Sequence, residues 1–374
     1  MARLKVASLR LALCMMVLLT MLTTGSMASA HTTRKASGLT MSPLSAAGGM
    51  QGATKPIMSL PQGGLSPSLQ SGPKVVPSPS PGSANNVLTG IETISATNIW
   101  AVGFFANTGG PVQTLILHWN GRRWRVIPSP NPGSFDNELN GIDAVSATNI
   151  WAVGFFANTG GSYQTLIEHW NGTSWSVVPS PSPGSAKNVL NGIDVVSATN
   201  IWTVGSFANT GSSFQTLIEH WNGVSWSVVS SPSPGSAFNT LTGIDAVSAT
   251  DIWAAGDLVN TTGPDQTLIE HWNGTSWSVV PSPSPGSNFN RLRGIEAVSA
   301  TNIWAVGSFE NMGGPEQTLV EHWDGVSWSV VPSPNPGSAL NRLNGIEAVS
   351  ATNIWAVGLF NIIGPPQTLI EKIV

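Results

Sequence analysis

The stretch Ser95-Ala96-Thr97-Asn98-Ile99-Trp100-Ala101-Val102-Gly103 decides the fold, because it returns five more times at a fixed spacing. Its tryptophan recurs at Trp151, Trp202, Trp253, Trp304 and Trp355, so that each step is 51 residues (151 − 100). A fixed period of about 20 to 50 residues is typical of propellers and solenoids. The sequence therefore predicts one repeat array over most of the chain.

Each unit contains the pattern of four short strands. In the first unit, residues 88–94 alternate in polarity, and residues 99–105 are almost continuously apolar, as in a strand covered on both faces. Residues 113–119 follow, and Asn120-Gly121 then predicts a hairpin turn before residues 124–128. Four antiparallel strands in a unit of this length are typical of a propeller blade. We therefore predict an all-β, six-bladed β-propeller with four-stranded antiparallel blades.

The two ends of the repeat array complement each other. The sixth unit stops at Val374 and lacks the Asn-Gly turn and the fourth strand. Before the first unit, Lys74–Pro81 resembles the fourth strand and Ser-Pro tail of an inner unit, for example Val177–Pro183. Pairing the spare N-terminal strand with the incomplete blade would close the ring and remove exposed strand edges. We predict that the last blade is closed in this way.

The unit resembles the kelch-type and Trp-Ala-Val-Gly repeats of secreted bacterial propellers over about 300 of the 374 residues. Gly103 at a strand end and Trp124, six residues after His118, fit the kelch layout. Phe104 departs from it, because kelch units usually carry a second glycine there. The resemblance implies a fold like the central domain of galactose oxidase, and a fold alone does not carry function.

The region before the repeats predicts export. Residues 1–30 combine a basic start (Arg3, Lys5, Arg10), an apolar core from Leu11 to Leu22 and the small residues Ala28-Ser29-Ala30, as in a signal peptide cleaved after Ala30. Residues 31–73 are rich in Ser, Gly and Pro and predict a disordered linker, so that 74–374 would be the propeller. We expect a secreted, extracellular and monomeric protein of bacterial type, without a membrane span in the mature chain.

Composition excludes several kinds of chemistry. The only cysteine, Cys14, would leave with the signal peptide, so the mature chain would have no disulfide, no thiolate metal site and no crosslinked copper site like that of galactose oxidase. Residues 75–374 carry eight basic and nineteen acidic residues, a balance of −11 (8 − 19). Such an acidic body is unsuited to nucleic acid, which needs clustered Lys and Arg.

Three polar sets recur with the period. A histidine repeats in the third strand, and we predict structural hydrogen bonds for it, because histidines of separate blades cannot converge on one metal. An asparagine before each inner strand, at Asn86 and its equivalents, predicts a cap. A carboxylate on each innermost strand is open to two interpretations, a hydrogen-bonding staple between blades or a weak candidate cation ring for Ca²⁺. The ring members are Glu92, Asp143, Asp194, Asp245, Glu296 and Glu347, and we predict no cofactor beyond this candidate.

Strand order divides the turns between two faces. We call the face with the first-to-second and third-to-fourth turns the turn face, where the sequence barely changes between units. The opposite face, the loop face, varies around the expected channel mouth, and variable loops on a rigid scaffold often bind ligands. The alternative is neutral drift of an exposed rim. The candidate ligand-binding residues are Arg291, Arg293, Arg342, Asp136, Glu138, Phe238 and Phe289.

The function hypothesis is a secreted, non-catalytic propeller that binds a carbohydrate, peptide or cell-envelope ligand on the loop face. Arginine suits carboxylate groups, and phenylalanine can stack on a sugar or peptide. The alternatives are a structural or adhesive surface protein without a specific ligand and a glycan-active enzyme, such as a glycosidase or lyase. No catalytic set stands out, because the lone Tyr163 lies away from Arg291 and Arg342, and the six ring acids show no differentiated pair.

Overall fold

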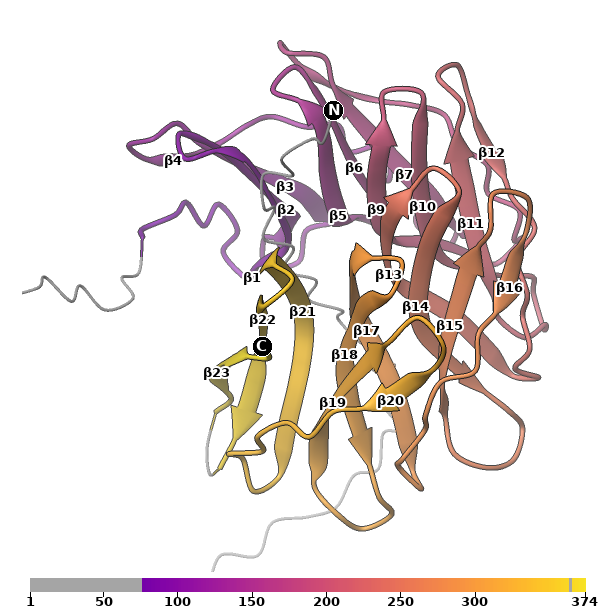
Figure 1. Ribbon diagram of the computed structural model, residues 1–374. Coiled ribbons are helices and arrows are strands. Elements are labelled where there is room, and N and C mark those ends of the chain that lie inside the picture. Colours follow the sequence, from indigo (N-terminus) through magenta and orange to yellow (C-terminus); the bar gives the residue numbers. More distant parts are fainter. Residues whose placement is uncertain (1–75, 363–364) are drawn as a thin grey trace, which may run out of the picture. The chain divides into compact units, whose positions relative to one another are not determined.

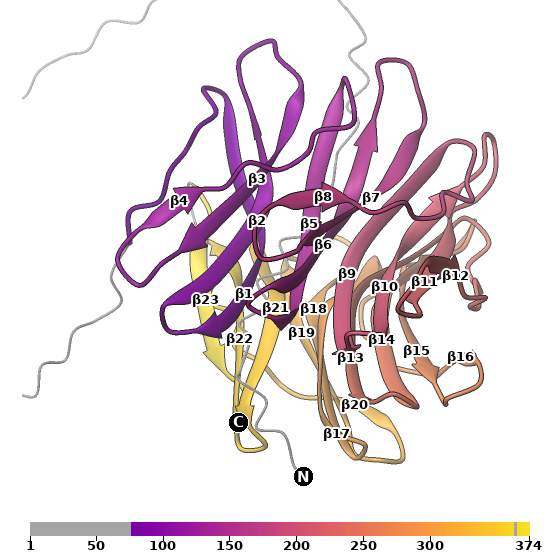
Figure 2. The same ribbon diagram turned by 90° about the horizontal axis from the view of Figure 1, so that it is seen from above.

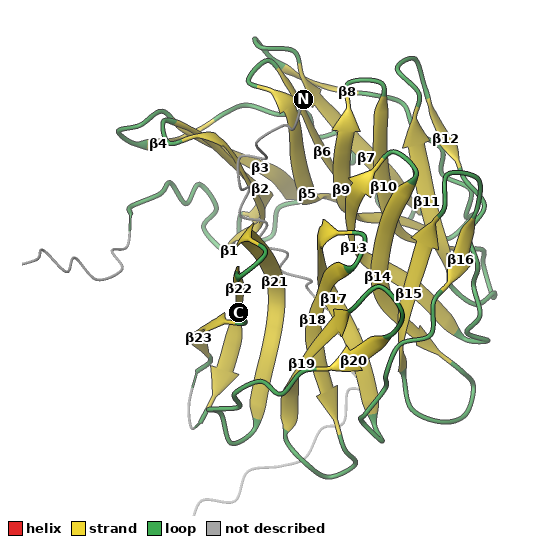
Figure 3. Ribbon diagram, in the orientation of Figure 1, coloured by secondary structure: helices red, strands yellow, loops and turns green. Residues whose placement is uncertain are grey.

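The computed structural model describes residues 76–362 and 365–374, and Pro77–Val374 forms one compact unit built of strands (Figures 1 and 3). The described residues form 23 strands and no helix. The predicted signal peptide 1–30 and linker 31–73 lie outside the described residues. Within residues 76–374, leaving out 363–364, no helix could cross a bilayer.

The strands form six antiparallel sheets, and these sheets are the six predicted blades. In each sheet the strands pair in chain order, and Figure 2 shows the blades following one another from β1 to β21. The innermost strands are β1 (Asn85–Ser95), β5 (Asp136–Ser146), β9 (Lys187–Ser197), β13 (Phe238–Ser248), β17 (Phe289–Ser299) and β21 (Leu340–Ser350). The second strands are β2 (Asn98–Ala106), β6 (Asn149–Ala157), β10 (Asn200–Ala208), β14 (Asp251–Val259), β18 (Asn302–Glu310) and β22 (Asn353–Asn361).

The two outer strands are shorter. The third strands are β3 (Val112–Trp119), β7 (Tyr163–Trp170), β11 (Gln215–Trp221), β15 (Gln266–Trp272), β19 (Glu316–Trp323) and β23 (Gln367–Lys372). The fourth strands are β4 (Trp124–Val126), β8 (Trp175–Val177), β12 (Trp226–Val228), β16 (Trp277–Val279) and β20 (Trp328–Val330). The predicted architecture of four-stranded blades is therefore confirmed in five sheets, and the sixth has three strands.

The glycine that ends the repeated motif is explained by the register of the first two strands. The pairing of β1 with β2 shifts between Leu88 and Gly90, as at a β-bulge. The bulge brings the carbonyl oxygen of Val87 so close to Gly103 that an added Cβ would lie 2.0 Å from it. A larger residue would therefore displace the backbone, and the same contact recurs in the other blades.

The core lies between blades, where one face of each sheet packs on the next. Trp100, Val102 and Ile116 of the first blade share a cluster with Leu139 and Trp175 of the second. The ring of Trp100 lies 5.7 Å from that of Trp175, edge to face, which is a favourable aromatic geometry. Because the same residues recur every 51 positions, the sequence period reproduces one interface several times around the ring.

The junction between the sixth blade and the first is the least covered. Trp355 is 39% exposed, whereas its five counterparts are between 2% and 6% exposed. Ile370 on β23 is 62% exposed, although its counterpart Val320 on β19 is only 1% exposed. The surfaces that the other junctions bury are therefore partly open here.

The predicted closing strand, Lys74–Pro81, lies partly outside the described residues, which begin at Val76. The sixth sheet consists of β21, β22 and β23, and the described residues Val76–Pro81 form no strand. In the register of the repeat, Pro77–Gly82 matches the Ser-Pro segment Pro128–Gly133, which lies outside the sheet in the first blade as well. The residues that match β4 itself are 73–75, where a proline takes the place of Trp124, and they lie outside the described residues.

Candidate functional site

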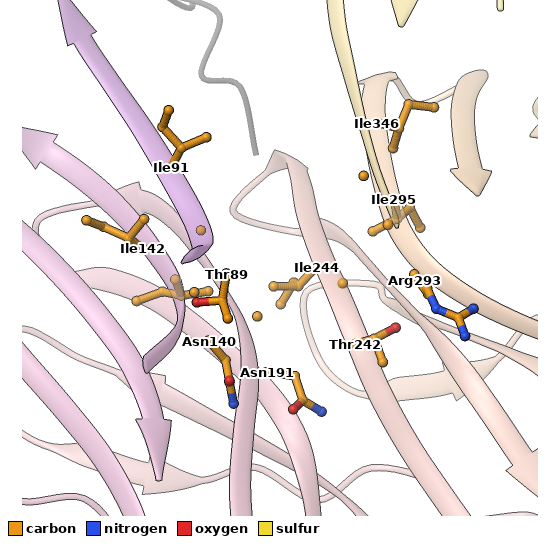
Figure 4. Close-up of a pocket in the computed structure, with 17 residues that line it drawn as sticks. Thr89, Ile91, Asn140, Ile142, Asn191, Thr242, Ile244, Arg293, Ile295 and Ile346 are labelled. Atoms are coloured by element: carbon orange, nitrogen blue, oxygen red, sulfur yellow. The ribbon is translucent and has the colours of Figure 1, made fainter. Parts of the chain in front are cut away.

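The centre of the ring holds a narrow cavity that is too small for an organic ligand. Its volume is about 60 Å³, and it is lined by residues from all six innermost strands (Figure 4). Small-molecule pockets are usually about 300 to 1,000 Å³. The lining repeats one glycine-isoleucine pair per blade, for example Gly90 and Ile91, beneath a polar position such as Thr89 or Asn140. These polar groups serve the ring, since Asn140 Nδ2 donates to Leu190 O at 2.8 Å.

Hydrogen bonds of two of the six innermost-strand carboxylates support the interpretation of these groups as a staple between blades. Asp143 Oδ2 accepts the backbone N–H of Val195 in the next blade at 2.7 Å, and Asp245 Oδ2 accepts that of Ala297 at 2.7 Å. These hydrogen bonds link adjacent innermost strands. In residues 76–362 and 365–374, no three acidic or histidine side chains lie close enough to share a metal ion.

The repeated histidines are structural, as predicted. His118 Nε2 lies 2.8 Å from Asn98 Oδ1, and the same oxygen accepts a hydrogen bond from Trp100 Nε1 at 2.9 Å. Because this amide oxygen only accepts, Nε2 of His118 carries a proton and donates. The histidine ring also stacks on Trp100, with centroids 4.3 Å apart. Burial and the nearby Arg125 lower the pKa of His118, which keeps its ring neutral.

Replacing one of these asparagines should destabilise the propeller. In the third blade, Asn200→Ala would leave the donors Trp202 Nε1 and His220 Nε2 without their shared acceptor. We expect a loss of about 1–3 kcal/mol of unfolding free energy, measured by thermal unfolding. Asn200→Asp is the matched control and should cost much less, because Asp251 makes the same two bonds in the fourth blade. Equal losses in both variants would contradict this role.

The predicted asparagine cap is present and also joins neighbouring blades. Asn137 Oδ1 accepts the N–H of Gly133, and its Nδ2 donates to Gly133 O and to Val112 O of the preceding blade. Four of its equivalents bond in the same way, at Asn188, Asn239, Asn290 and Asn341. These bonds hold the start of each innermost strand against the β2–β3 type loop of the blade before it.

The predicted arginines of the loop face carry acid partners. Arg291 Nη2 lies 2.5 Å from Asp265 Oδ2, and its Nε lies 4.0 Å from Asp257 Oδ2. The guanidinium carbon of Arg291 lies 5.0 Å from the centroid of the Phe289 ring. Burial raises the pKa of Asp257 to about 7, against the opposing charges of Arg291 and Arg293. Arg291 of the fifth blade is therefore linked to the fourth blade through Asp265.

Arg342 and Arg293 are also bound to neighbouring side chains, unlike a freely exposed arginine. Arg342 binds Glu316 through two parallel hydrogen bonds of 2.8 Å, the strongest geometry for this pair. Burial raises the pKa of Glu316, but hydrogen bonds from Arg342 and Ser308 outweigh it, so the pKa lies below its ordinary value. Arg293 is only 6% exposed, lines the central cavity and donates to Ser308 Oγ at 3.1 Å.

The predicted acids Asp136 and Glu138 lie together in a different part of the mouth. Asp136 is 8% exposed, and its Oδ1 has no hydrogen-bond partner among the described residues. Burial and the neighbouring Asp136 raise the pKa of Glu138 to about 8, while Lys187 of the third blade lowers it. Burial also raises the pKa of Tyr163, as do the charges of Asp136 and Glu138 and the hydrogen bond that Tyr163 donates to Asp136. We call these four residues the polar cluster.

An aromatic strip continues from the polar cluster. Lys187 Nζ lies 5.5 Å from the centroid of the Tyr163 ring and 5.7 Å from that of Phe214. Phe214 in turn lies 5.0 Å from the predicted site residue Phe238. The structure therefore brings Asp136, Glu138 and Phe238 into one neighbourhood, whereas Phe289 belongs with Arg291.

Sequence reasoning missed the partners at the start of the third strand, Tyr163, Phe214, Asp265 and Glu316. A signal was present, because Asp265–Arg291 and Glu316–Arg342 are both spaced by 26 residues. This spacing joins the start of the third strand in one blade to the innermost strand of the next. A search for complementary residues at this offset would have found both ion pairs.

Sequence reasoning also missed a buried acid on the third strand of several blades. Glu168, Glu219, Glu270 and Glu321 are each 0% exposed, and neither carboxyl oxygen of any of them has a hydrogen-bond partner among the described residues. Burial raises the pKa of Glu219 and of Glu270 to about 8. The signal was the alternation of the strand, which places Glu168 on the same side as Leu166.

No family model matches the chain, and no curated protein matches it. Among solved structures, the chain is similar to YCF48 bound to D1 peptide, with 14% identity over 73% of this chain and 74% of that one and a TM-score of 0.45. It is similar to Trypanosoma rangeli sialidase, with 13% identity over 74% and 52% and a TM-score of 0.46. It is also similar to the Aleuria aurantia lectin, with 13% identity over 74% and 92% and a TM-score of 0.38.

These likenesses carry no argument about function at such TM-scores, and the propeller assignment rests on the sheets described above. The resemblance to kelch-type repeats stays a prediction.

Proposed function

We propose that the chain is an exported, non-catalytic propeller that binds a carbohydrate, peptide or other cell-envelope ligand on its loop face. The observation that carries the proposal is the contrast between the two faces. On the turn face, the same hydrogen-bonded set of Asn or Asp, Trp and His recurs in five blades. On the loop face, the residue after the capping asparagine changes from Glu138 to Thr240 to Arg291.

We place the ligand at the mouth of the channel, beside the central cavity of about 60 Å³. The mouth carries charged and aromatic side chains on a rigid ring of strands, which is the arrangement that suits recognition. The part of the proposal that concerns export rests on the signal-like composition of residues 1–30.

Binding should depend on the loop face and not on the turn face. We would probe residues 31–374 on arrays of glycans, cell-wall polymers and peptides, beside two double variants. Phe238→Ala/Phe289→Ala removes two partly buried rings from the loop face and should weaken binding by about tenfold or more. Arg122→Ala/Arg123→Ala removes two exposed charges from the turn face and should leave binding unchanged.

These variants separate the two faces more cleanly than removal of the arginines would. Arg291→Ala or Arg342→Ala would also leave Asp265 or Glu316 without its partner, so that stability and binding would change together. Binding that only the turn-face variant abolishes would overturn the assignment of the face. Release of products from any array glycan would overturn the non-catalytic part.

A further inference from the structure

The polar cluster occurs once in the ring, although the blades are otherwise close copies. At the place of Asp136 the other blades carry Asn85, Lys187, Phe238, Phe289 and Leu340. All of these innermost strands form with the same length, so the fold does not require an acid there. Burying a charged group costs free energy. An acid that carries this cost without serving the fold is a candidate for binding.

One oxygen of Asp136 could accept a donor from a ligand. The residue is 8% exposed, Tyr163 donates a hydrogen bond to its carboxylate, and its Oδ1 atom has no hydrogen-bond partner in the part of the chain that the structure describes. A buried acceptor without a partner costs about 1–3 kcal/mol, and more when it is charged. A ligand O–H or N–H group that reaches this oxygen would recover that free energy.

The charges of the polar cluster nearly balance at neutral pH. Because burial and Asp136 raise the pKa of Glu138 to about 8, this side chain keeps its proton near pH 7. Burial raises the pKa of Asp136 and lowers that of Lys187, while the opposite charges of the two groups counter both shifts. An anion would meet Asp136, and a cation would meet Lys187, so neither is favoured over an uncharged ligand.

The hydrogen-bonding capacities match those of adjacent hydroxyl groups. Ionised Asp136 only accepts hydrogen bonds, Lys187 only donates them, and protonated Glu138 does both. A sugar hydroxyl also both donates and accepts. Beside these groups, Phe214 and Phe238 are partly exposed rings with centroids 5.0 Å apart, and such rings pack against the apolar face of a sugar.

We propose that the polar cluster between the second and third blades, together with Phe214 and Phe238, is a binding site for an uncharged carbohydrate. Asp136 accepts a ligand hydroxyl, Lys187 donates to a ligand oxygen, and the phenylalanine rings support the sugar ring. The inference rests on the proposed function and narrows its ligand to neutral carbohydrate.

The test uses titration calorimetry with residues 31–374 and three classes of oligosaccharide. Neutral probes are manno-, galacto-, gluco- and N-acetylglucosamine oligosaccharides, the anionic probe is oligogalacturonate, and the cationic probe is chitosan oligosaccharide. At least one neutral probe should bind. Asp136→Asn and Lys187→Ala should each weaken it about tenfold or more, as expected for loss of a charge-assisted hydrogen bond.

A control variant outside the polar cluster makes the test specific. Leu340→Ala changes the position of Asp136 in the sixth blade and should have no effect on binding. Thermal unfolding should show that Asp136→Asn is still folded at the temperature of the calorimetry, so that a loss of affinity reports the site and not unfolding.

The outcomes separate this inference from the function on which it rests. If a ligand binds equally well to Asp136→Asn and Lys187→Ala, the site is overturned and the binding function stands. Binding confined to the anionic or cationic probe overturns the ligand class. If a folded sample binds no glycan, wall polymer or peptide, both proposals fall.

Discussion

Between pH 6.5 and pH 8 the melting temperature of the propeller should fall as the pH rises, because four buried glutamates must release protons to the solvent when the chain unfolds. These residues, Glu168, Glu219, Glu270 and Glu321, are fully buried between blades and have no hydrogen-bond partners among the described residues. In the register of the second blade, Glu168 lies beside Ala152 and Val177, which cannot donate to it from their side chains.

The direction of the change in melting temperature follows from the difference between the pKa of each glutamate in the folded chain and its pKa in the unfolded chain. Burial raises the pKa of Glu219 and Glu270 from 4.5 to about 8, and raises those of Glu168 and Glu321 well above 4.5. Between pH 4.5 and pH 8 the folded chain therefore holds protons that the unfolded chain has lost. Stability from these groups is complete below pH 4.5 and declines until the folded pKa is passed.

The histidines restrict where this decline can be observed. Burial lowers the pKa of His118, His169, His220 and His322 from 6.5, so these rings oppose folding below pH 6.5. The two effects oppose each other in mild acid. Above pH 6.5 the opposing contribution of the histidines fades, and the four glutamates should set the slope together with Glu138 and Asp257, whose pKa values burial raises to about 8 and about 7.

The glutamates can be separated from other titrating groups by substitution. A variant with Glu→Gln at all four positions should show a much flatter melting temperature between pH 6.5 and pH 8. A full pKa unit corresponds to about 1.4 kcal/mol per site, so the difference in slope between the parent and the quadruple variant should be measurable. A second variant is Glu219→Leu. It introduces the residue of the first blade, where Leu117 occupies the equivalent position and is 1% exposed.

Calorimetry and circular dichroism would measure the effect. A parent protein whose melting temperature rises or stays level from pH 6.5 to pH 8 would contradict the assignment. So would a quadruple variant with the same slope as the parent. Glu371 can be compared with the four buried glutamates, because it differs from them in having a hydrogen-bond donor: one of its oxygens accepts a hydrogen bond from Ser333 Oγ at 2.6 Å.

The repeat period made the blades predictable from the sequence. Every blade must build the same interface, so the features that recur, such as Trp100, Gly103 and His118, report the common structure directly. The structure confirms the strand order, the caps and the structural histidines on this basis. Recurrence identifies what each blade needs and says little about what one blade does alone.

The loop-face contacts were less predictable because they join different blades. The sequence placed Arg291 and Arg342 at the mouth, but their acid partners lie 26 residues earlier, in the preceding blade. A pattern read within one unit does not contain this pair. The polar cluster has the same origin, since Lys187 of the third blade meets Asp136 and Glu138 of the second.

The closing strand stays a prediction, because residues 73–75, which match β4, lie outside the described residues, and the described part that follows them has little capacity to pair. Pro77–Pro81 alternates proline with serine, and proline has no N–H group to donate to a neighbouring strand. The matching segments in the complete blades lie outside their sheets for the same reason. The uncovered side of the sixth blade is therefore a property of the structure that only a comparison of blades reveals.

Trp202→Ala should destabilise the propeller far more than Trp355→Ala, although the two tryptophans occupy the same place in the repeat. Trp202 is 3% exposed and packs against His220, Trp272 and Trp277, with ring centroids 4.2, 5.1 and 5.8 Å away. Its removal should cost about 3–5 kcal/mol. Trp355 is 39% exposed at the junction with the first blade, so its removal should cost less than half as much.

The pair of variants measures how the junction behaves in solution, with thermal unfolding as the readout. Both substitutions remove the same side chain from the same strand position, so differences in strand propensity cancel and burial remains. If Trp355→Ala proves as destabilising as Trp202→Ala, the sixth blade packs against the first in solution, and Trp119 and Trp124 are the rings that would cover Trp355 by analogy with the other junctions. A small effect would mean that the ring is held by its other junctions, as the exposure of Trp355 and Ile370 indicates.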